Sequence, residues 1–386
     1  MGHYYFDHNA TTPVSREALE AMLPAFAEVY GNASSIHHYG QAAKQKLESA
    51  RRQVAEFLRC HPNEIVFTSG GTEADNLAVF GVVRQAGAPR KHVVTTAIEH
   101  PAVLNACAQL EREGVAVTYV RVGSAGVVDP DDIRRALRPE TVLITVMHAN
   151  NELGTLQPVR EISRIAREAG VIFHSDGVQA AGKAPVNVHE LGVDLYTVSG
   201  HKLYAPKGIG ALYVRKGVRL APLLFGGHHE RDRRPGTENV AGAAGLGAAA
   251  AWLREHFADL NARLAGLRDR LERGILDAVP QARVNCAGSP RVPNTSNIQF
   301  AGVEGEPLLI ALDLKGFAVS SGAACSSGAV EPSHVLTAIG LSREQARSCL
   351  RFSLGRSNDA AQVDALVEAV AAAVAHLERL SPRAHA

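Results

Sequence analysis

Between residues 64 and 215, the chain alternates short apolar runs with longer stretches in which apolar residues recur at helical spacing. The runs are "EIVFT" (64–68), "HVVTT" (92–96), "VLITVMH" (142–148), "VIFHS" (171–175) and "GALYVR" (210–215). Nearly continuous apolar runs of this length are typical of strands buried on both faces of a parallel sheet. The stretches 70–83, 100–113 and 159–170 between them predict helices. This alternation predicts an α/β domain with a mainly parallel sheet.

The pattern changes after residue 240. The small-residue run 241–253 predicts a tightly packed buried helix, and 257–276 carries leucines at helical spacing (Leu260, Leu264, Leu267 and Leu271). We interpret these leucines as core positions of a helix that leads to a second domain. The predicted boundaries are a large domain over 13–255 and a smaller domain formed by 1–12 and 256–386.

The amino-acid composition limits the class of protein but does not indicate which reaction or ligand is involved. The 386 residues are 46% hydrophobic and 20% charged with a formal net charge of +1, so neither nucleic acid nor an anionic membrane is an expected partner. No apolar run approaches the ~20 residues of a membrane span, and the start of the chain does not resemble a secretory signal. The five cysteines are odd in number and scattered, which argues against a disulfide framework and favours a reducing cytoplasm.

Three polar motifs follow predicted strands, where ligands bind in such sheets. "FTSGGTEADNL" (67–77) is a glycine turn before a helix, suited to an anion or simply to a helix cap. Asp176, which by itself would also suit a helix cap, follows a second strand, and Ser199, His201 and Lys202 follow a third. Phosphate loop, carboxylate and lysine in this order are the groups that pyridoxal phosphate requires, since lysine binds the cofactor covalently and aspartate keeps its ring nitrogen protonated.

A further motif surrounds Cys325, in "VSSGAACSSGAVEPSHVL" (319–336). Free cysteine is commonly a small buried hydrophobe, but Ser, Gly and Ala neighbours cannot enclose a thiol in an apolar pocket. We therefore expect Cys325 on an adaptable surface loop. A helix should follow, with Pro332 in its first turn.

The chain closely resembles the cysteine desulfurases of the NifS/IscS type, in the class V aminotransferase group of fold-type I pyridoxal phosphate enzymes. The resemblance spans almost the whole chain, and its motifs are "YFDHNATTP", "FTSGGTEADN", "EHPAV", "HANNELGT", "HSDGVQAAGK", "SGHKLYAPKGIG", "RRPGTEN", "SSGAACSSGAVEPSHV" and "RFSLGRSN". It implies a large domain with a mainly parallel seven-stranded sheet flanked by helices, and a smaller α+β domain that carries the Cys325 loop.

The resemblance also implies roles for single residues. Lys202 would bind the cofactor, Asp176 would pair with its ring nitrogen and Gln179 with its ring hydroxyl. His100 would stack on the ring and move protons. The remaining cofactor contacts would come from Gly71, Thr72, Asn151, Ser199 and His201, and from Thr237 acting on the phosphate of a neighbouring subunit in a homodimer.

The implied reaction converts L-cysteine to L-alanine. Asn151 and Arg351 would hold the substrate carboxylate, although an arginine that we place near a strand end is usually a surface charge. Cys325 would take the sulfur as a persulfide, for delivery to an iron–sulfur scaffold protein or another acceptor. Cys325 could also serve as a transient metal ligand, in a [2Fe-2S] cluster shared with that scaffold.

Other readings stay open at this point. A selenocysteine lyase or small-amino-acid transaminase of the same fold would work without Cys325, and a non-catalytic sulfur carrier would use Cys325 alone, although clusters usually need four protein ligands. Three positions depart from the usual family pattern: "GAAC" (322–325), Ala205 and Gly177. None of them removes a catalytic group. The acceptor could serve general iron–sulfur assembly, nitrogenase maturation or tRNA thiolation.

Overall fold

A seven-stranded sheet forms the centre of the computed structural model, which describes residues 2–321 and 332–380. The strand order is β2-β8-β7-β6-β5-β3-β4, and β8 alone runs antiparallel to its neighbours in this sheet. The predicted mainly parallel α/β sheet is therefore confirmed. Its strands are β2 (Ile65–Thr68), β3 (His92–Thr96), β4 (Ala116–Val120), β5 (Thr141–Thr145), β6 (Ile172–Asp176), β7 (Leu195–Ser199) and β8 (Gly210–Val214).

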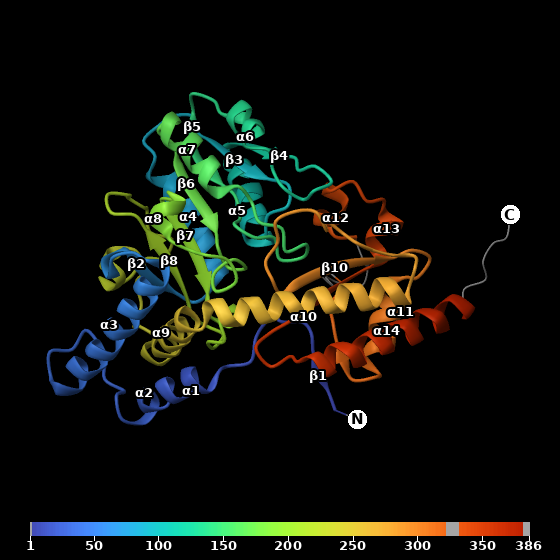
Figure 1. Cartoon of the computed structure of the whole chain (residues 1–386). Coiled ribbons are helices and arrows are strands. Elements are labelled where there is room, and N and C mark those ends of the chain that lie inside the picture. The colour runs from blue at the N-terminus through green and yellow to red at the C-terminus, as the bar shows by residue number, and fades with distance from the viewer. Residues whose placement is uncertain (1, 322–331, 381–386) are drawn as a thin grey trace.

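Helices cover both faces of this sheet (Figure 1). Four of its strands are buried at every position and β5 and β6 at all but one, as the continuous apolar runs predict, whereas β4 at the edge is mostly half-buried. The helices of this region are α1 (Arg16–Met22), α2 (Pro24–Ala27), α3 (His38–Leu58), α4 (Gly71–Gln85), α5 (Pro101–Arg112), α6 (Pro130–Ala136), α7 (Val159–Ala169), α8 (Val188–Leu191) and α9 (Val240–Glu255). Short 3-10 turns are η1 (Pro62–Glu64), η2 (Gly200–Lys202) and η3 (His229–Asp232).

The long helix α10 (Phe257–Ala278) leads from this layered body to the C-terminal elements (Figure 1). Its leucines at 260, 264, 267 and 271 are buried, as the spacing predicts. The C-terminal part contains a three-stranded antiparallel sheet of order β12-β10-β9, and the N-terminal strand β1 pairs with β11. Its other elements are β1 (Tyr4–Tyr5), β9 (Ala282–Val284), β10 (Thr295–Phe300), α11 (Gly305–Asp313), β11 (Phe317–Ala318), α12 (His334–Ala338), α13 (Arg343–Arg347), β12 (Cys349–Ser353) and α14 (Ala360–Leu380).

By length and composition, α14 could cross a membrane, but its apolar face has partners in this fold. Val363, Leu366 and Val370 are buried on the side that packs against α10 and α11. Asp364 on the same helix forms an ion pair with Arg270 of α10 at 2.5 Å. Packing within the protein thus covers one side of α14, and 33% of its most apolar stretch is buried.

Candidate active site

A cavity of about 390 Å³ opens at the carboxyl ends of the parallel strands. This volume is within the usual range of small-molecule sites, roughly 300–1,000 Å³. Of the residues predicted from the sequence, it gathers those from six separate segments: Gly71, Thr72, His100, Asn151, Asp176, Gln179, Ser199, His201, Lys202 and Arg351. Cys325 lies outside the described residues.

The amino end of α4 forms one wall of the cavity. The helix begins at Gly71, and the first N–H groups of a helix have no partner inside it. A Cβ at Gly71 would lie 3.0 Å from Cγ2 of Val178 and 3.4 Å from Cβ of Ser199, so a side chain there would crowd the wall. Glycine therefore leaves backbone donors exposed beside the Ser199 hydroxyl, an arrangement suited to a phosphate.

Lys202 reaches the cavity from the turn that follows β7. Its Nζ donates to the carbonyl oxygens of Asn9 and Ala10, both at 2.6 Å. Burial, followed by the charge of Arg351, lowers the pKa of Lys202 to about 8, against the smaller opposing effects of Asp7 and Asp176. The lowered pKa gives more neutral amine near pH 7 than an ordinary lysine has, which suits an amine that must act as a nucleophile.

Asp176 ends β6 and is buried in the cavity floor. Its Oδ1 accepts the Val178 N–H at 2.9 Å. Burial raises its pKa, while the neighbouring His100 and Lys202 act in the opposite direction. Asp75 also lines the cavity, and burial together with the charge of Asp176 raises its pKa well above the usual value. Of the two carboxyls, Asp176 is the one with cationic neighbours and so the one suited to pair with a protonated ring nitrogen.

His100 caps α5 and also lines the cavity. Pro101 is the first residue of α5, and His100 caps that helix by accepting the Ala102 N–H at Nδ1 (3.1 Å). This hydrogen bond assigns the proton of the neutral ring to Nε2. Desolvation, followed by Lys202 and His334, lowers the pKa of His100 in spite of Asp176. The neutral ring can therefore hold a proton at Nε2.

Arg351 lies in the middle of β12 and is only 6% exposed, so the expectation of a strand-end position was wrong. Its Nη1 donates to the Asn151 carbonyl at 3.0 Å and its Nη2 to Oδ1 of Asp7 at 2.7 Å. Within the described chain, its buried Nε has no hydrogen-bond partner. A fixed guanidinium with an unused donor beside a cavity suits recognition of a carboxylate.

The segment that contains Cys325 is attached to the site at both ends. Ser320 exchanges two backbone hydrogen bonds with Arg351, at 2.7 and 3.2 Å. On the other side, the Ser333 hydroxyl donates to Oε2 of Glu152 at 2.5 Å. The following helix α12 begins at His334 with Ser333 as its cap, so Pro332 precedes the helix and is not in its first turn as predicted. The helix begins later than predicted because the Ser333 side-chain oxygen accepts hydrogen bonds from the N–H groups of Val335 and Leu336.

Thr237 is exposed and does not line the cavity. The segment before Thr237 is held to α4 by Arg234, which forms an ion pair with Glu73 of that helix at 2.8 Å. Thr237 is thus available to another molecule, and its role in a neighbouring subunit stays a prediction.

Several residues of the site were not predicted. Asn9 is the centre of a network, because its carbonyl accepts from both Lys202 and Gln179 and its side chain contacts Lys183, Asn294 and Thr295. No local pattern places residue 9 beside residue 202. A signal for Asp75 did exist. Ala78, Val79 and Val82 lie on the same face of α4, and Asp75 is a charged residue on that otherwise apolar face.

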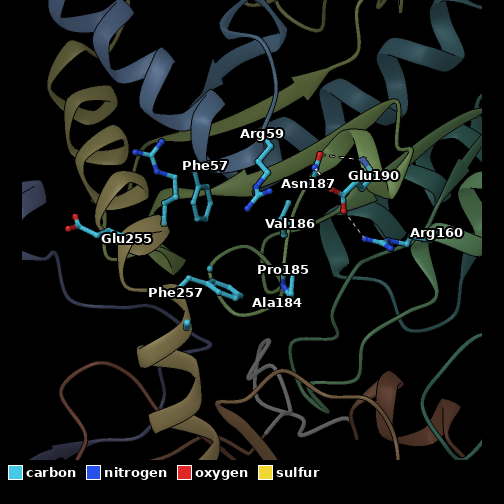
Figure 2. Close-up of a pocket in the computed structure, with 13 residues that line it drawn as sticks. Phe57, Arg59, Arg160, Ala184, Pro185, Val186, Asn187, Glu190, Glu255 and Phe257 are labelled. Carbon is cyan, nitrogen blue, oxygen red and sulfur yellow. Dashed lines mark hydrogen bonds and ion pairs between the residues drawn. The ribbon is translucent and has the colours of Figure 1, made fainter.

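A second cavity of about 370 Å³ has a different chemistry (Figure 2). Figure 2 shows Phe57, Phe257, Pro185 and Val186 around it, with Arg59 pointing inward. It has no lysine, aspartate or glycine-rich helix start among its lining residues. Chemistry, not size, identifies the first cavity as the candidate active site.

The residues of the first cavity fit pyridoxal phosphate. The open start of α4 would take the phosphate, the buried Asp176 carboxylate the protonated ring nitrogen, and Lys202 the carbonyl carbon. A group of three or more His, Cys, Asp or Glu that could hold a metal ion is absent from residues 2–321 and 332–380. Cys325, the predicted transient cluster ligand, is not among those residues.

Comparisons with known proteins point to the same chemistry. The family model "Aminotransferase class-V" matches residues 4–366. A protein of Gluconacetobacter diazotrophicus called cysteine desulfurase is 48% identical over 385 residues, which cover 99% of this chain and 96% of the relative. A solved structure of a NifS-like protein has a TM-score of 0.91 and 35% identity, with coverage of 97% and 100%. A structure described as SspA in complex with cysteine has a TM-score of 0.82 and 37% identity, with coverage of 91% and 98%.

Proposed function

Because the chain belongs to the class-V aminotransferase family, we propose that it is a pyridoxal-phosphate-dependent cysteine desulfurase. The observation that carries this proposal is the convergence of Lys202, Asp176 and the start of α4 on one cavity, beside which both ends of the Cys325 segment are attached. The cofactor, when bound, withdraws electrons from the substrate's Cα and so labilises the bonds around it.

The side chains that line the cavity bind the substrate and transfer protons. Arg351 and Asn151 orient the carboxylate of L-cysteine, and Arg351 is itself held in place by Asp7. Lys202, with its lowered pKa, is the nucleophilic amine, and His100 holds a proton at Nε2 beside it. The cavity is shared by all four groups, so the substrate is held where proton transfers can reach it.

Sulfur transfer is assigned to Cys325. Its thiolate attacks the substrate sulfur, an S–S bond forms as the substrate C–S bond breaks, and the carbon takes up a proton so that alanine leaves. The other four cysteines are unsuited to this attack, because burial raises the pKa of Cys60, Cys107 and Cys349 to about 12 and that of Cys286 to about 11. None of these four is in a disulfide.

We also propose an oligomeric state, a sulfur acceptor and a cellular location for the protein. A homodimer is supported by large apolar side chains that are exposed on α1–α3 and the turns between them, and at 224–225. Leu23, Phe26, Ile36 and Phe225 are among them. The acceptor would be an iron–sulfur scaffold protein or another sulfur acceptor, with a [2Fe-2S] cluster shared transiently at Cys325 as a further role. Free cysteines throughout the described chain agree with a reducing cytoplasm. We also retain the division into 13–255 and the remainder as two domains.

The decisive experiment follows the sulfur. Incubation of the parent enzyme with L-cysteine and no reductant should add one sulfur atom, about 32 mass units, to the peptide that contains Cys325. The variant Cys325→Ser should retain the cofactor and its cysteine-induced spectral change, yet lose alanine and sulfide production by orders of magnitude, since a hydroxyl is a far poorer nucleophile than a thiolate. The matched control is Cys286→Ser, for which near-parental turnover is expected. Undiminished turnover in Cys325→Ser would leave a selenocysteine lyase or transaminase instead.

A further inference from the structure

Lys183 lies directly behind the cavity and has no role in the proposed reaction. Its Nζ donates to Oε1 of Gln179 at 2.6 Å and to Oδ1 of Asn9 at 3.2 Å. With Lys202 and His8 it lines a small void that adjoins the active site. Its chain neighbours Gly182 and Ala184 border the second cavity, in which Figure 2 labels Ala184. Lys183 therefore stands between the two cavities with its side chain directed to Gln179.

No carboxylate forms an ion pair with Lys183 in the described part of the chain. The charged or titratable groups that act on it or respond to it are Lys202 and His201 at η2, Arg351 of β12 and His8 of the N-terminal segment. All of them are basic. Desolvation, followed by the charges of Lys202 and Arg351, lowers the pKa of Lys183 to about 7. An ammonium in this position lacks a compensating anion until a ligand brings one.

The hydrogen bond from Lys183 is one of two that set which way the Gln179 amide faces. An ammonium can only donate, so Lys183 requires the carbonyl oxygen Oε1 on its side. Nε2 then points to the opposite side, where it donates to the Asn9 carbonyl at 2.9 Å. The amide nitrogen carries a second N–H, and Gln179 lines the cavity. Without the ammonium, Oε1 would lose its donor, and only the bond from Nε2 to the Asn9 carbonyl would hold the amide in this orientation.

We propose that Lys183 is a positioning residue, which orients the Gln179 amide as a donor and places positive charge behind it to favour the ionised ring hydroxyl of bound pyridoxal phosphate. This inference rests on the cofactor of the proposed function. It adds a residue that touches neither substrate nor cofactor and acts through Gln179.

The test is a pH titration of the visible absorbance of the bound cofactor. In Lys183→Met, which keeps the length of the side chain and removes its charge, the apparent pKa of the chromophore should rise by about one unit, because one cation has been lost. Affinity of the cofactor-free protein for pyridoxal phosphate should fall several-fold. Thermal stability of the cofactor-free protein should stay the same or increase, since a desolvated amine has been replaced by an apolar group. Lys315→Met, at an exposed lysine, is the matched control and should change none of the three.

A second pair of variants separates positioning from folding. Lys183→Arg keeps the charge and should hold the chromophore pKa within about 0.3 unit of the parent value. In a Gln179→Leu background, Lys183→Met should have a clearly smaller effect, because the amide through which it acts is gone. An unchanged chromophore pKa in Lys183→Met together with lower thermal stability would overturn the proposal. Failure of the parent enzyme to form alanine from cysteine would instead count against the desulfurase function, since the titration reads any bound cofactor.

Discussion

Burial and a few neighbouring charges set the protonation of each reacting group at the scale of single residues. Lys202 has a pKa of about 8 because the cavity desolvates it beside Arg351. His201 is lowered to about 4 by burial and the surrounding cations, so it is neutral at pH 7 and can donate or accept at a phosphate. At pH 7 the His201 imidazole is therefore neutral, whereas Lys202 is mostly protonated but loses its proton more easily than an ordinary lysine.

The lysine assignment gives the first residue-scale prediction. Borohydride reduction of the holoenzyme should fix the cofactor to Lys202, and peptide mapping should find the pyridoxyl group there. Lys202→Ala should bind the cofactor only reversibly and lose turnover by several orders of magnitude. Lys207, exposed on the same segment, is the matched control. Label on Lys183 or Lys207 in the parent enzyme would refute the assignment.

The second residue-scale prediction concerns Glu152. Burial raises its pKa to about 7, so the folded state holds a proton that the unfolded state releases near pH 4.5. Its contribution to stability is therefore fully present below pH 4.5 and is lost as pH rises through about 7. Glu152→Gln, which cannot ionise, should flatten this part of the stability profile, with a gain on the order of a few kcal/mol at pH 8 relative to pH 5.

Unfolding midpoints of the parent and the variant between pH 5 and 8 would measure this effect. Glu344→Gln, at an exposed glutamate, should follow the parent profile. Parallel profiles for Glu152→Gln and the parent would show that Glu152 does not carry a proton in the folded state.

Short elements hold the site together at the scale of helices and strands. The cap of α5 places His100 at the cavity, the cap of α12 joins Ser333 to Glu152, and His334 Nε2 interacts with the Glu99 carbonyl at 3.0 Å. Strand β7 contributes Tyr196, whose ring fills the space that Gly177 leaves open. Gly177 is one of the departures from the usual family pattern, and this contact gives its physical reason.

The element-scale prediction follows from that contact. In Gly177→Ala, the new Cβ would overlap the ring and the hydroxyl oxygen of Tyr196, and that hydroxyl is hydrogen-bonded to His148 at 2.8 Å. Such overpacking should destabilise the protein by about 1–3 kcal/mol. In Gly177→Ala/Tyr196→Leu, the loss should be smaller than the sum of the single changes.

Gly266 of α10 offers a control of opposite sign, because a Cβ there meets nothing within 4 Å. Gly266→Ala should stabilise by roughly 0.5–1 kcal/mol through helix propensity. Thermal or urea unfolding of the four variants would test the set. Full stability in Gly177→Ala alone would show that Tyr196 can move at no cost.

Segments far apart in the chain are locked together at the scale of the whole molecule. Arg51 of α3 forms a bidentate ion pair with Glu230 at 2.7 Å for both bonds, and both side chains are almost fully buried. Glu230 also accepts the Phe67 N–H of β2 at 2.9 Å. These bonds fix the segment that leads to Thr237 beside the helices with exposed apolar side chains. The proposed dimer interface and Thr237 are thus parts of one rigid region.

The corresponding prediction is a homodimer with shared sites. Phe26→Asp should shift the protein towards monomer in sedimentation experiments, whereas Ile310→Asp, at another exposed apolar position, should not. Thr237→Ala should weaken retention of the cofactor in the partner subunit, which dialysis of mixed dimers can measure. A parent protein that is monomeric and fully active at all concentrations would contradict the shared-site proposal.

The sequence by itself determined the parallel sheet, the buried leucines of α10 and the motifs that follow the strands. Those features depend on local periodicity and on the rule that ligands bind at the carboxyl ends of strands, so they can be read along the chain. Only the tertiary structure decided that Asn9 joins Lys202 to Gln179, that Asn9 also contacts Lys183, and that Arg351 pairs with Asp7. These contacts join residues up to 344 positions apart, and such pairs are set by how the sheets and helices pack, for which local spacing holds no signal.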